Sequence, residues 1–298
     1  MKVIAATLVY GFIEAGKTTY IQDQILNSPS HAQGATLILC FEEGQEEYDE
    51  RALSSRQARV AYYRGGESVP DFCRRMLEQF DPNRVFVEMN GMRHGLKEKL
   101  PEELSVVRSV TLIDGTTLPI YMTNMRQHLQ NMVVASDVVV FNRCQGKQDL
   151  LAYSPVFQLM NRKAGFLWID AEGKREKAFD APLPFDEQAD DIEVNGSNYI
   201  SFILTALIHP ECCDGKSLRL FGQYRDGRIG RTVMTCCPAD LQFLGIPCDS
   251  LDCPNDAWVS ASGTVEVSTD DSGQKRLILR VTAYEIKEPP KQPVLSAL

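Results

Sequence analysis

The sequence lacks any apolar run close to the roughly 20 residues that a membrane-spanning helix needs. It also lacks internal repeats and low-complexity tracts. Basic residues are in the minority: 31 Lys and Arg face 40 Asp and Glu, and the formal net charge is −9. This acidic balance argues against a general nucleic-acid or anionic-membrane surface. The 44% apolar and 24% charged residues are typical of a soluble globular protein.

Length and cysteine content limit the organisation and the location of the protein. A chain of 298 residues is long enough for about two domains. Its start, MKVIAATLVYGF, has the lysine and the apolar stretch of a signal peptide, but cleavage there would remove the glycine-rich stretch that begins at Gly11. We therefore predict a cytoplasmic protein whose nine cysteines are reduced.

The stretch GFIEAGKTTY, residues 11–20, has the spacing of a phosphate-binding P-loop and follows an apolar run. Glycines let the backbone approach phosphate oxygens, while loop N–H groups and the positive end of a following helix face the anion. Lys17 is expected to reach the β- and γ-phosphates, and the Thr18 hydroxyl to ligate Mg²⁺. The alternative is a glycine-rich turn with a chance lysine. The loop residues predicted to bind nucleotide are Gly11, Ala15, Gly16, Lys17, Thr18 and Thr19.

Up to about residue 170, continuously apolar strand-like runs alternate with runs of helical period. Strands that are apolar throughout are expected when both faces of a sheet are covered. The pattern predicts an α/β fold, a P-loop NTPase parallel sheet with helices on both faces. Strands are expected at 3–10, 35–41, 84–90, 105–114, 134–142 and 164–170.

The character of the sequence changes near residue 178, so residues 1–178 are predicted to be the P-loop nucleotide-binding domain. Residues 179–197 are acidic, contain two prolines and are predicted to be a linker. Residues 198–290 alternate β-rich runs with turn signals, which predicts a small C-terminal antiparallel β-barrel of OB-like type that contains cysteines. Residues 291–298 are expected to form a loosely ordered tail.

Two other strand ends supply groups for the expected site. A P-loop needs a second carboxylate near Mg²⁺, and RVFVEMNGM supplies Glu88 followed by Gly91. We predict that Glu88 acts in catalysis with Lys17 and Thr18 and holds Mg²⁺ together with Thr18, and that the Gly91 N–H approaches the γ-phosphate. The alternative for Glu88 is a solvated glutamate at a strand end. VVVFNRCQ predicts that Asn142 contacts the purine and fixes the P-loop.

Together these segments resemble the CobW-like GTPases, which include cobalamin-biosynthesis, nickel-insertion and zinc metallochaperones. The family's G-F-L-G-A-G-K-T-T is similar to GFIEAGKTT, its hhhExxG to VFVEMNG, its V-D-A to TLIDGTT with Asp114, and its A-D-x-x-x-x-N-K-x-D to ASDVVVFNRCQ. The resemblance covers residues 1 to about 170. It implies a slow GTPase that binds GTP and Mg²⁺ and contacts the base through Asn142, Arg143 and Gln145.

The sequence departs from this family at three points. Gln145 replaces the Asp that reads guanine, and because its amide offers one donor and one acceptor, ATP is not excluded. Asp149 is an alternative base reader. The C-x-C-C metal motif is absent from the first domain, and Glu14 brings a carboxylate near the phosphates. Glu43 and Gly44 occupy the place of a switch loop, or else form a plain acidic surface loop.

Residues from about 200 to 290 resemble the C-terminal domain of permease-associated proteins of Gram-positive bacteria, a family of poorly defined function. The similar runs are VMTCCPAD and DAWVSASGTVEV. Cys236 and Cys237 are candidate Zn²⁺ ligands, or else small buried hydrophobic residues. Further thiolates for such a site would come from Cys212, Cys213, Cys248 and Cys253.

The leading hypothesis is a nucleoside-triphosphate-binding and hydrolysing switch, coupled through the C-terminal domain to metal handling or to a permease partner. A metal-receiving client protein is the other expected partner. The alternative is a non-enzymatic adaptor module in which bound nucleotide is structural. Few aromatic residues are available for stacking in the second domain, so nucleic acid is not an expected partner. They are Tyr224, Trp258 and Tyr284.

Overall fold

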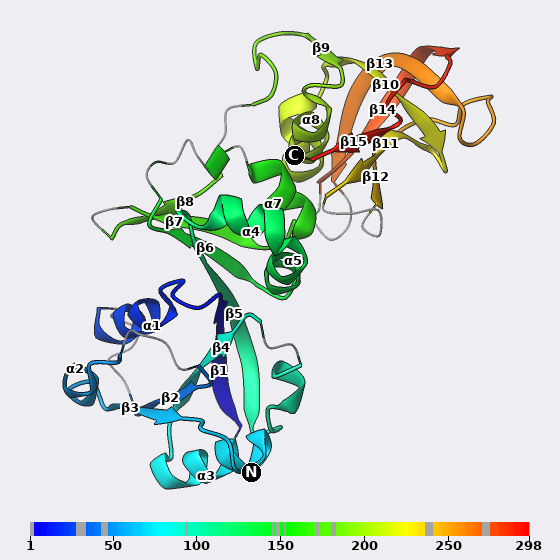
Figure 1. Ribbon diagram of the computed structural model, residues 1–298. Helices are drawn as coiled ribbons and strands as arrows, with labels where there is room; N and C mark the ends of the chain where they lie inside the picture. The colour runs from blue at the N-terminus through cyan, green and yellow to red at the C-terminus, as the bar shows by residue number, and fades with distance from the viewer. Residues whose placement is uncertain are drawn as a thin grey trace. The chain divides into compact units, whose positions relative to one another are not determined.

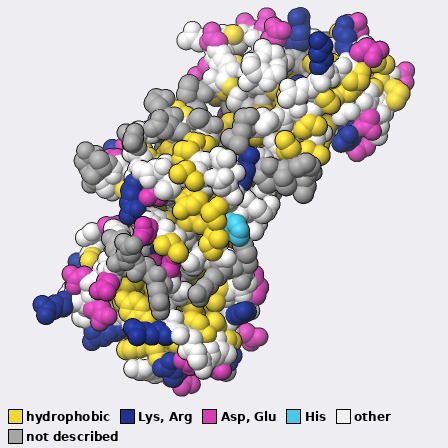
Figure 2. All heavy atoms as spheres, in the orientation of Figure 1, with side chains coloured by type: hydrophobic (Ala, Val, Ile, Leu, Met, Phe, Trp, Pro, Cys, Tyr) yellow, Lys and Arg dark blue, Asp and Glu magenta, His cyan; other side chains and the backbone are white. Residues whose placement is uncertain are grey.

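The computed structural model describes two compact units (Figure 1). The first takes in Met1–Leu151 and Lys163–Phe179, and the second Ala152–Arg162 and Asp180–Leu298. None of the described helices is long and apolar enough to cross a membrane. Figure 2 shows acidic and basic side chains interspersed over the face that it displays. The described residues are 3–27, 34–42, 47–92, 95–144, 146, 150–151, 153–170, 173–179, 183–235, 241–269 and 275–297.

The first unit is built on an eight-stranded sheet of order β3-β2-β4-β1-β5-β6-β7-β8. Neighbouring strands are parallel, except that β7 and β8 are antiparallel. The bounds are β1 (Ile4–Gly11), β2 (Thr36–Cys40), β3 (Ala58–Tyr62), β4 (Arg84–Asn90), β5 (Leu104–Asp114), β6 (Val138–Asn142), β7 (Gly165–Ile169) and β8 (Arg175–Lys177).

Helices cover both faces of this sheet (Figure 1). Val9 of β1 packs in one apolar cluster with the helices α1 (Lys17–Leu26) and α2 (Glu50–Ser54), whereas its neighbour Leu8 packs in another with α3 (Val69–Phe80). The alternation follows from the period of two along a strand. The predicted parallel sheet with helices on both faces is confirmed. The other helices among the described residues of this unit are η2 (Lys97–Lys99), α4 (Leu118–Asn124) and α5 (Arg126–Val134).

The carboxyl ends of the parallel strands meet at one edge of the sheet. The register pairs Gly11 at the end of β1 with Asn90 of β4, and Cys40 at the end of β2 with Glu88. Farther along, Asp114 of β5 pairs with Asn142 of β6. In open α/β sheets, ligands bind outside this edge.

The second unit contains a seven-stranded sheet with the antiparallel path β12-β11-β10-β13-β14. Two short strands add in parallel, β9 to β10 and β15 to β11. The bounds are β9 (Asp191–Val194), β10 (Ser217–Arg225), β11 (Arg228–Met234), β12 (Leu241–Pro247), β13 (Trp258–Thr269), β14 (Lys275–Ile286) and β15 (Val294–Ser296).

The predicted antiparallel β domain is confirmed as a sheet but not as a closed barrel. In the part of the chain that the structure describes, no strand ladder joins β12 to β14, although an isolated bridge links Cys248 to Leu279. Residues 282–286 of β14 are exposed, which leaves this edge of the sheet open. An OB-like fold is therefore not established.

Several segments differ from the expected pattern. The expected linker, 179–197, includes β9, and the expected loose tail, 291–298, includes β15. The helix α8 (Tyr199–Ile208) contributes five buried residues to the second unit. One of them is Tyr199, whose hydroxyl donates to the Leu244 carbonyl at 2.8 Å. The helix α7 (Ser154–Met160), encoded between β6 and β7, also belongs to this unit and contacts α8. The 3₁₀ turn η3 (Pro210–Cys213) follows α8.

Candidate nucleotide-binding site

The glycine-rich stretch connects the end of β1 directly to the start of α1. Gly16 has φ +85°, a left-handed conformation that glycine adopts without strain, and a Cβ there would lie 2.5 Å from Asn142 Nδ2. A Cβ at Gly11 would lie 2.9 Å from the Leu112 carbonyl oxygen. Both glycines therefore permit a close approach of chains. Within the same stretch Ala15 is buried and Thr19 is exposed.

Lys17, the first residue of α1, is buried rather than solvated. Its Nζ donates to the carbonyl oxygens of Phe12 at 2.7 Å and Gly11 at 3.3 Å. It also forms an ion pair of 2.5 Å with Glu42 Oε2, and the two side chains are 2% and 4% exposed. Glu42 was not among the predicted site residues. It follows the predicted strand 35–41, so its place at the end of a parallel strand was the available signal.

Glu88 lies next to Thr18, although the two residues are 70 positions apart in the sequence. The Thr18 hydroxyl donates to Glu88 Oε1 at 3.1 Å, and the hydroxyl of the buried Tyr48 donates to Oε2. Glu88 is 4% exposed, so it is not a solvated strand end. Burial raises the pKa of Glu88, against the hydrogen bond from Tyr48 and the charge of Lys17. Tyr48 was not predicted either, because nothing in the sequence around it indicates that its hydroxyl contacts Glu88.

Gly91, directly after β4, and Asn142, at the end of β6, hold the loop from opposite sides of β1. The Gly91 N–H donates to the Gly11 carbonyl at 2.9 Å. Asn142 Nδ2 donates to the Ala15 carbonyl at 2.8 Å, so this side chain contacts the loop as expected. Asn142 Oδ1 is buried and has no hydrogen-bond partner among the described residues. A buried acceptor without a partner is available to a ligand.

Arg143 lies beside the loop with its guanidinium held at two points. Nη1 donates to the Glu14 carbonyl at 2.8 Å and to Asp114 Oδ2 at 2.9 Å. Burial alone would raise the pKa of Asp114, but hydrogen bonds from Thr116 and Arg143 lower it. The Arg143 side chain is still 48% exposed, so one face is open to a ligand. The Glu14 side chain is exposed.

Six residues singled out in the sequence lie outside the described residues. They are two expected switch residues, two expected base readers and two candidate zinc ligands: Glu43, Gly44, Gln145, Asp149, Cys236 and Cys237.

A cavity of about 310 Å³ opens beside the carboxylate of Glu88. Four glutamates line it, together with Arg64 and several tyrosines. Cys40 also lines it, and burial followed by the nearby Glu88 charge raises the pKa of this thiol to about 12. The glutamates are Glu42, Glu47, Glu50 and Glu88.

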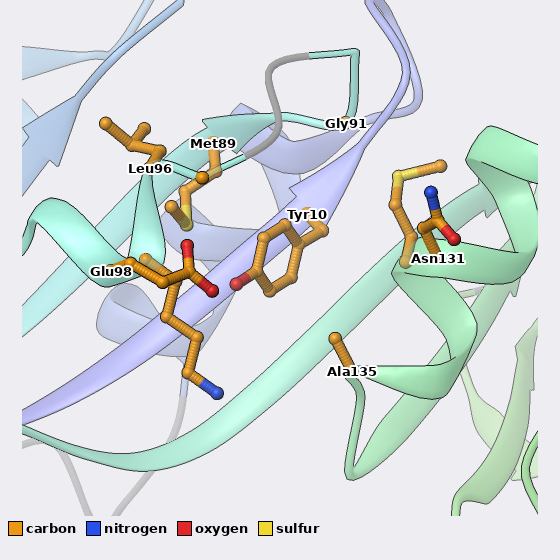
Figure 3. Close-up of a pocket in the computed structure, with 10 residues that line it drawn as sticks. Tyr10, Met89, Gly91, Leu96, Glu98, Asn131 and Ala135 are labelled. Atoms are coloured by element: carbon orange, nitrogen blue, oxygen red, sulfur yellow. The ribbon is translucent and has the colours of Figure 1, made fainter.

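A second cavity, of about 130 Å³, lies between the Gly91 turn and α5 (Figure 3). In Figure 3 the Glu98 carboxylate points toward the Tyr10 hydroxyl. Burial, and then this carboxylate, raises the pKa of Tyr10 to about 12. Gly91, whose N–H donates to the Gly11 carbonyl, therefore also borders this cavity.

The described cysteines do not gather into a metal site. No group of three or more His, Cys, Asp or Glu side chains suited to a metal ion occurs among the described residues. Cys212 and Cys213 have their sulfur atoms 3.6 Å apart. The hydrogen bond from Cys213 lowers the pKa of Cys212, and the same bond, with burial, raises the pKa of Cys213. Cys248 and Cys253 lie beyond β12, and neither forms a disulfide bond.

Residues 170–295 match the protein family described as the DUF1980 C-terminal domain. This confirms the resemblance expected for residues 200 to 290 and extends its range. No curated protein matches the chain.

Several solved structures are distantly similar to the chain. The Zn(II)-bound YjiA GTPase from E. coli is 18% identical, with 76% of this chain and 74% of that chain covered and a TM-score of 0.40. The hydrogenase maturation factor HypB from Archaeoglobus fulgidus is 14% identical, with 57% and 82% covered and a TM-score of 0.38. HypB from Helicobacter pylori in complex with nickel is 11% identical, with 55% and 78% covered and a TM-score of 0.35. These similarities are low, so the description of the first unit as a parallel α/β sheet with a glycine-rich loop rests on its own strand order and loop geometry.

Proposed function

We propose that this chain, which joins a P-loop unit resembling the CobW-like GTPases to a DUF1980 C-terminal domain, is a Mg²⁺-dependent nucleoside triphosphatase that works as a slow switch. The observation that carries the proposal is the convergence of Lys17, Thr18 and Glu88 at one sheet edge. A chance glycine-rich turn gives no reason for a buried carboxylate to meet the hydroxyl that follows the lysine.

Each of these residues has a role that its chemistry supports. The Lys17 ammonium would bind the β- and γ-phosphates, and the loop N–H groups would hold the other phosphate oxygens. Thr18 and Glu88 present a hydroxyl and a carboxylate oxygen 3.1 Å apart. Mg²⁺ prefers such oxygen ligands and is held by one or two carboxylates plus substrate phosphates, so the pair fits this ion. Bound Mg²⁺ would neutralise charge that develops on the transferred phosphoryl group.

GTP is the preferred substrate in this proposal, and ATP is not excluded. Asn142 is fixed to the loop through Nδ2 and keeps an unpartnered Oδ1 for a base. Asp114 and the Glu14 carbonyl orient the Arg143 guanidinium, whose exposed face would stack on the base. Gln145 would complete the contacts, and its amide can pair with either purine.

The DUF1980 domain would carry the output of the switch. We propose that hydrolysis alters the segment after β2 and thereby the domain's affinity for a metal ion or for a permease or client partner. Cys236 and Cys237 remain the proposed Zn²⁺ ligands. The alternative, a non-enzymatic adaptor with a structural nucleotide, requires nucleotide to bind without turnover.

The test compares nucleotide binding and turnover in the wild type, Lys17→Ala and Lys177→Ala. Lys177 is an exposed lysine of β8 and serves as the matched control. We expect Lys17→Ala to abolish hydrolysis and weaken triphosphate binding, while Lys177→Ala behaves as wild type. Full turnover in Lys17→Ala would overturn the assignment, and binding without turnover in the wild type would favour the adaptor.

A further inference from the structure

The ammonium of Lys17 has all three of its donors engaged by groups of the protein itself. An ammonium has three N–H donors. Here it makes two hydrogen bonds, to the carbonyls of Phe12 and Gly11, and one ion pair, to Glu42. A phosphate that binds Lys17 must therefore take over one of these three contacts.

Glu42 is the partner that a phosphate can replace. The two carbonyls belong to the loop itself: Phe12 also accepts from the Ala15 N–H and Gly11 from the Gly91 N–H. The Glu42 carboxylate, in contrast, accepts no aligned hydrogen bond from any described residue, so only the charge of Lys17 holds it. A triphosphate beside Lys17 would also confront this buried carboxylate with like charge, which is unfavourable at short range.

We propose that Glu42 controls nucleotide entry, because its carboxylate competes with the triphosphate for Lys17 and must withdraw before the nucleotide is held. This inference rests on the proposed function. Glu42 already lines the 310 Å³ cavity, so a withdrawn side chain has space to enter it. Arg64, which also lines this cavity, would be a cationic partner for the withdrawn carboxylate.

The same chain segment also contacts the proposed Mg²⁺ ligand. Glu42 contacts Lys17, and Tyr48, six positions later, donates its hydroxyl to Glu88. Withdrawal of the Glu42 side chain frees the phosphate-binding lysine, and release of the Tyr48 hydroxyl frees the carboxylate proposed to hold Mg²⁺.

The variant Glu42→Gln separates this competition from a merely structural role. Glutamine has nearly the same shape but no charge, so Lys17 would be buried without its counter-ion in the nucleotide-free protein. That state loses stability, whereas the nucleotide-bound state, in which phosphate replaces the carboxylate, loses little. Because the free protein loses stability and the nucleotide-bound protein loses little, the free energy of nucleotide binding becomes more favourable.

The experiment measures GTP affinity by calorimetry and the melting temperature of the nucleotide-free full chain. We expect Glu42→Gln to bind GTP about tenfold more tightly, equivalent to about 1.4 kcal/mol, and to melt at a lower temperature. Glu42→Asp, whose shorter side chain stretches the ion pair, should shift both quantities in the same direction by less. If Glu42→Gln does not fold, the affinity and melting temperature of Glu42→Asp test the proposal instead. Glu50→Gln removes the same charge from an exposed position on the same cavity and should leave both unchanged.

The outcomes separate this inference from the proposed function. If the wild type binds GTP and Lys17→Ala does not, but Glu42→Gln and Glu42→Asp bind no more tightly than wild type, the competition is refuted and the nucleotide site stands. If Glu50→Gln bound GTP more tightly by the same factor, the effect would come from the overall charge of the cavity, and the competition would also be refuted. If no variant binds GTP or ATP, the function itself falls, and the inference falls with it.

Discussion

The two units of this protein bring polar and thiol groups together to very different extents. In the first unit, residues that are distant in sequence meet at one edge of the sheet. Lys17 forms an ion pair with Glu42, and Glu88 accepts a hydrogen bond from Thr18. In the second, cysteines that are close in sequence form no described cluster of metal-ligand size. Proximity along the chain is therefore a poor guide to proximity in the fold.

The difference follows from strand direction. Every carboxyl end of a parallel sheet lies at the same edge, so residues after β1, β2 and β4 are collected there. Along an antiparallel path, successive strand ends alternate between opposite edges. Cys213 precedes β10 and Cys248 follows β12, so the order β10-β11-β12 places them at opposite ends of their strands.

The strongest test of this comparison is Glu88→Gln in the first unit. Glutamine keeps the shape and can still accept from Thr18, but it removes the charge proposed to hold Mg²⁺. We expect GTP binding to persist and the turnover number to fall by about 10² or more, the usual cost of removing a group that stabilises transition-state charge. Steady-state hydrolysis with varied Mg²⁺ measures it. Glu266→Gln, at an exposed ion pair of the second unit, is the control and should hydrolyse normally. Unchanged turnover in Glu88→Gln would remove Glu88 from the site.

The second test could break the comparison. If Cys236 and Cys237 bind Zn²⁺, the doubly substituted Cys236→Ser, Cys237→Ser chain should lose about one metal ion per molecule, with affinity that falls at lower pH because thiolates must be deprotonated. Metal content of anaerobically purified protein measures this, with Cys144→Ser of the first unit as control. A wild type without metal would return these residues to a structural role.

A smaller effect is expected at the base-reading position. Gln145→Asp replaces an amide that suits either purine by a carboxylate that favours guanine. We expect the preference for GTP over ATP to rise by about tenfold, or about 1.4 kcal/mol. Competition binding measures the change. If the wild type is already strongly selective and Asp149→Ala abolishes this, Asp149 is the base reader instead.

The smallest effect concerns the pH dependence of stability in the first unit. The folded state lowers the pKa of Asp114, so its contribution is complete above about 3.9, the value of an unperturbed aspartate, and is lost as pH falls through the lowered pKa. Asp114→Asn should therefore show a smaller loss of unfolding free energy on acidification than the wild type. Urea denaturation across this range measures it. Asp190→Asn, an exposed control of the second unit, should follow the wild type.

The sequence predicted those elements whose local pattern reflects their environment. Buried apolar runs such as β2 and the glycine spacing of the loop are of this kind, because burial on both faces and close backbone approach act directly on residue type. The strands β3 and β12 were not predicted, since both are partly exposed and polar residues interrupt their apolar pattern. The strands β9 and β15, which lie in segments read as linker and tail, are shorter than either.

Within the site, the predictable residues were those with a motif. Lys17, Thr18 and Asn142 belong to recognisable spacings, and the structure places each beside the loop. Glu42 and Tyr48 belong to no motif, and their partners, Lys17 and Glu88, are distant in sequence. For Glu42 the one signal was its place after a predicted strand, and Tyr48 carried none. The register of β2 against β4, which pairs Cys40 with Glu88, brings the end of β2 to the site.

The placement of α7 has a practical consequence for dividing the protein. Its residues lie between β6 and β7 in sequence, yet they pack on α8 in the second unit, so the backbone passes between the units three times. A fragment that begins at residue 180 would lack this helix and leave part of α8 uncovered. A fragment that ends there would carry α7 without its partner. Isolated halves are therefore poor substitutes for the intact chain, and an exchange of this helix between two copies is the form of misassembly to expect from such fragments.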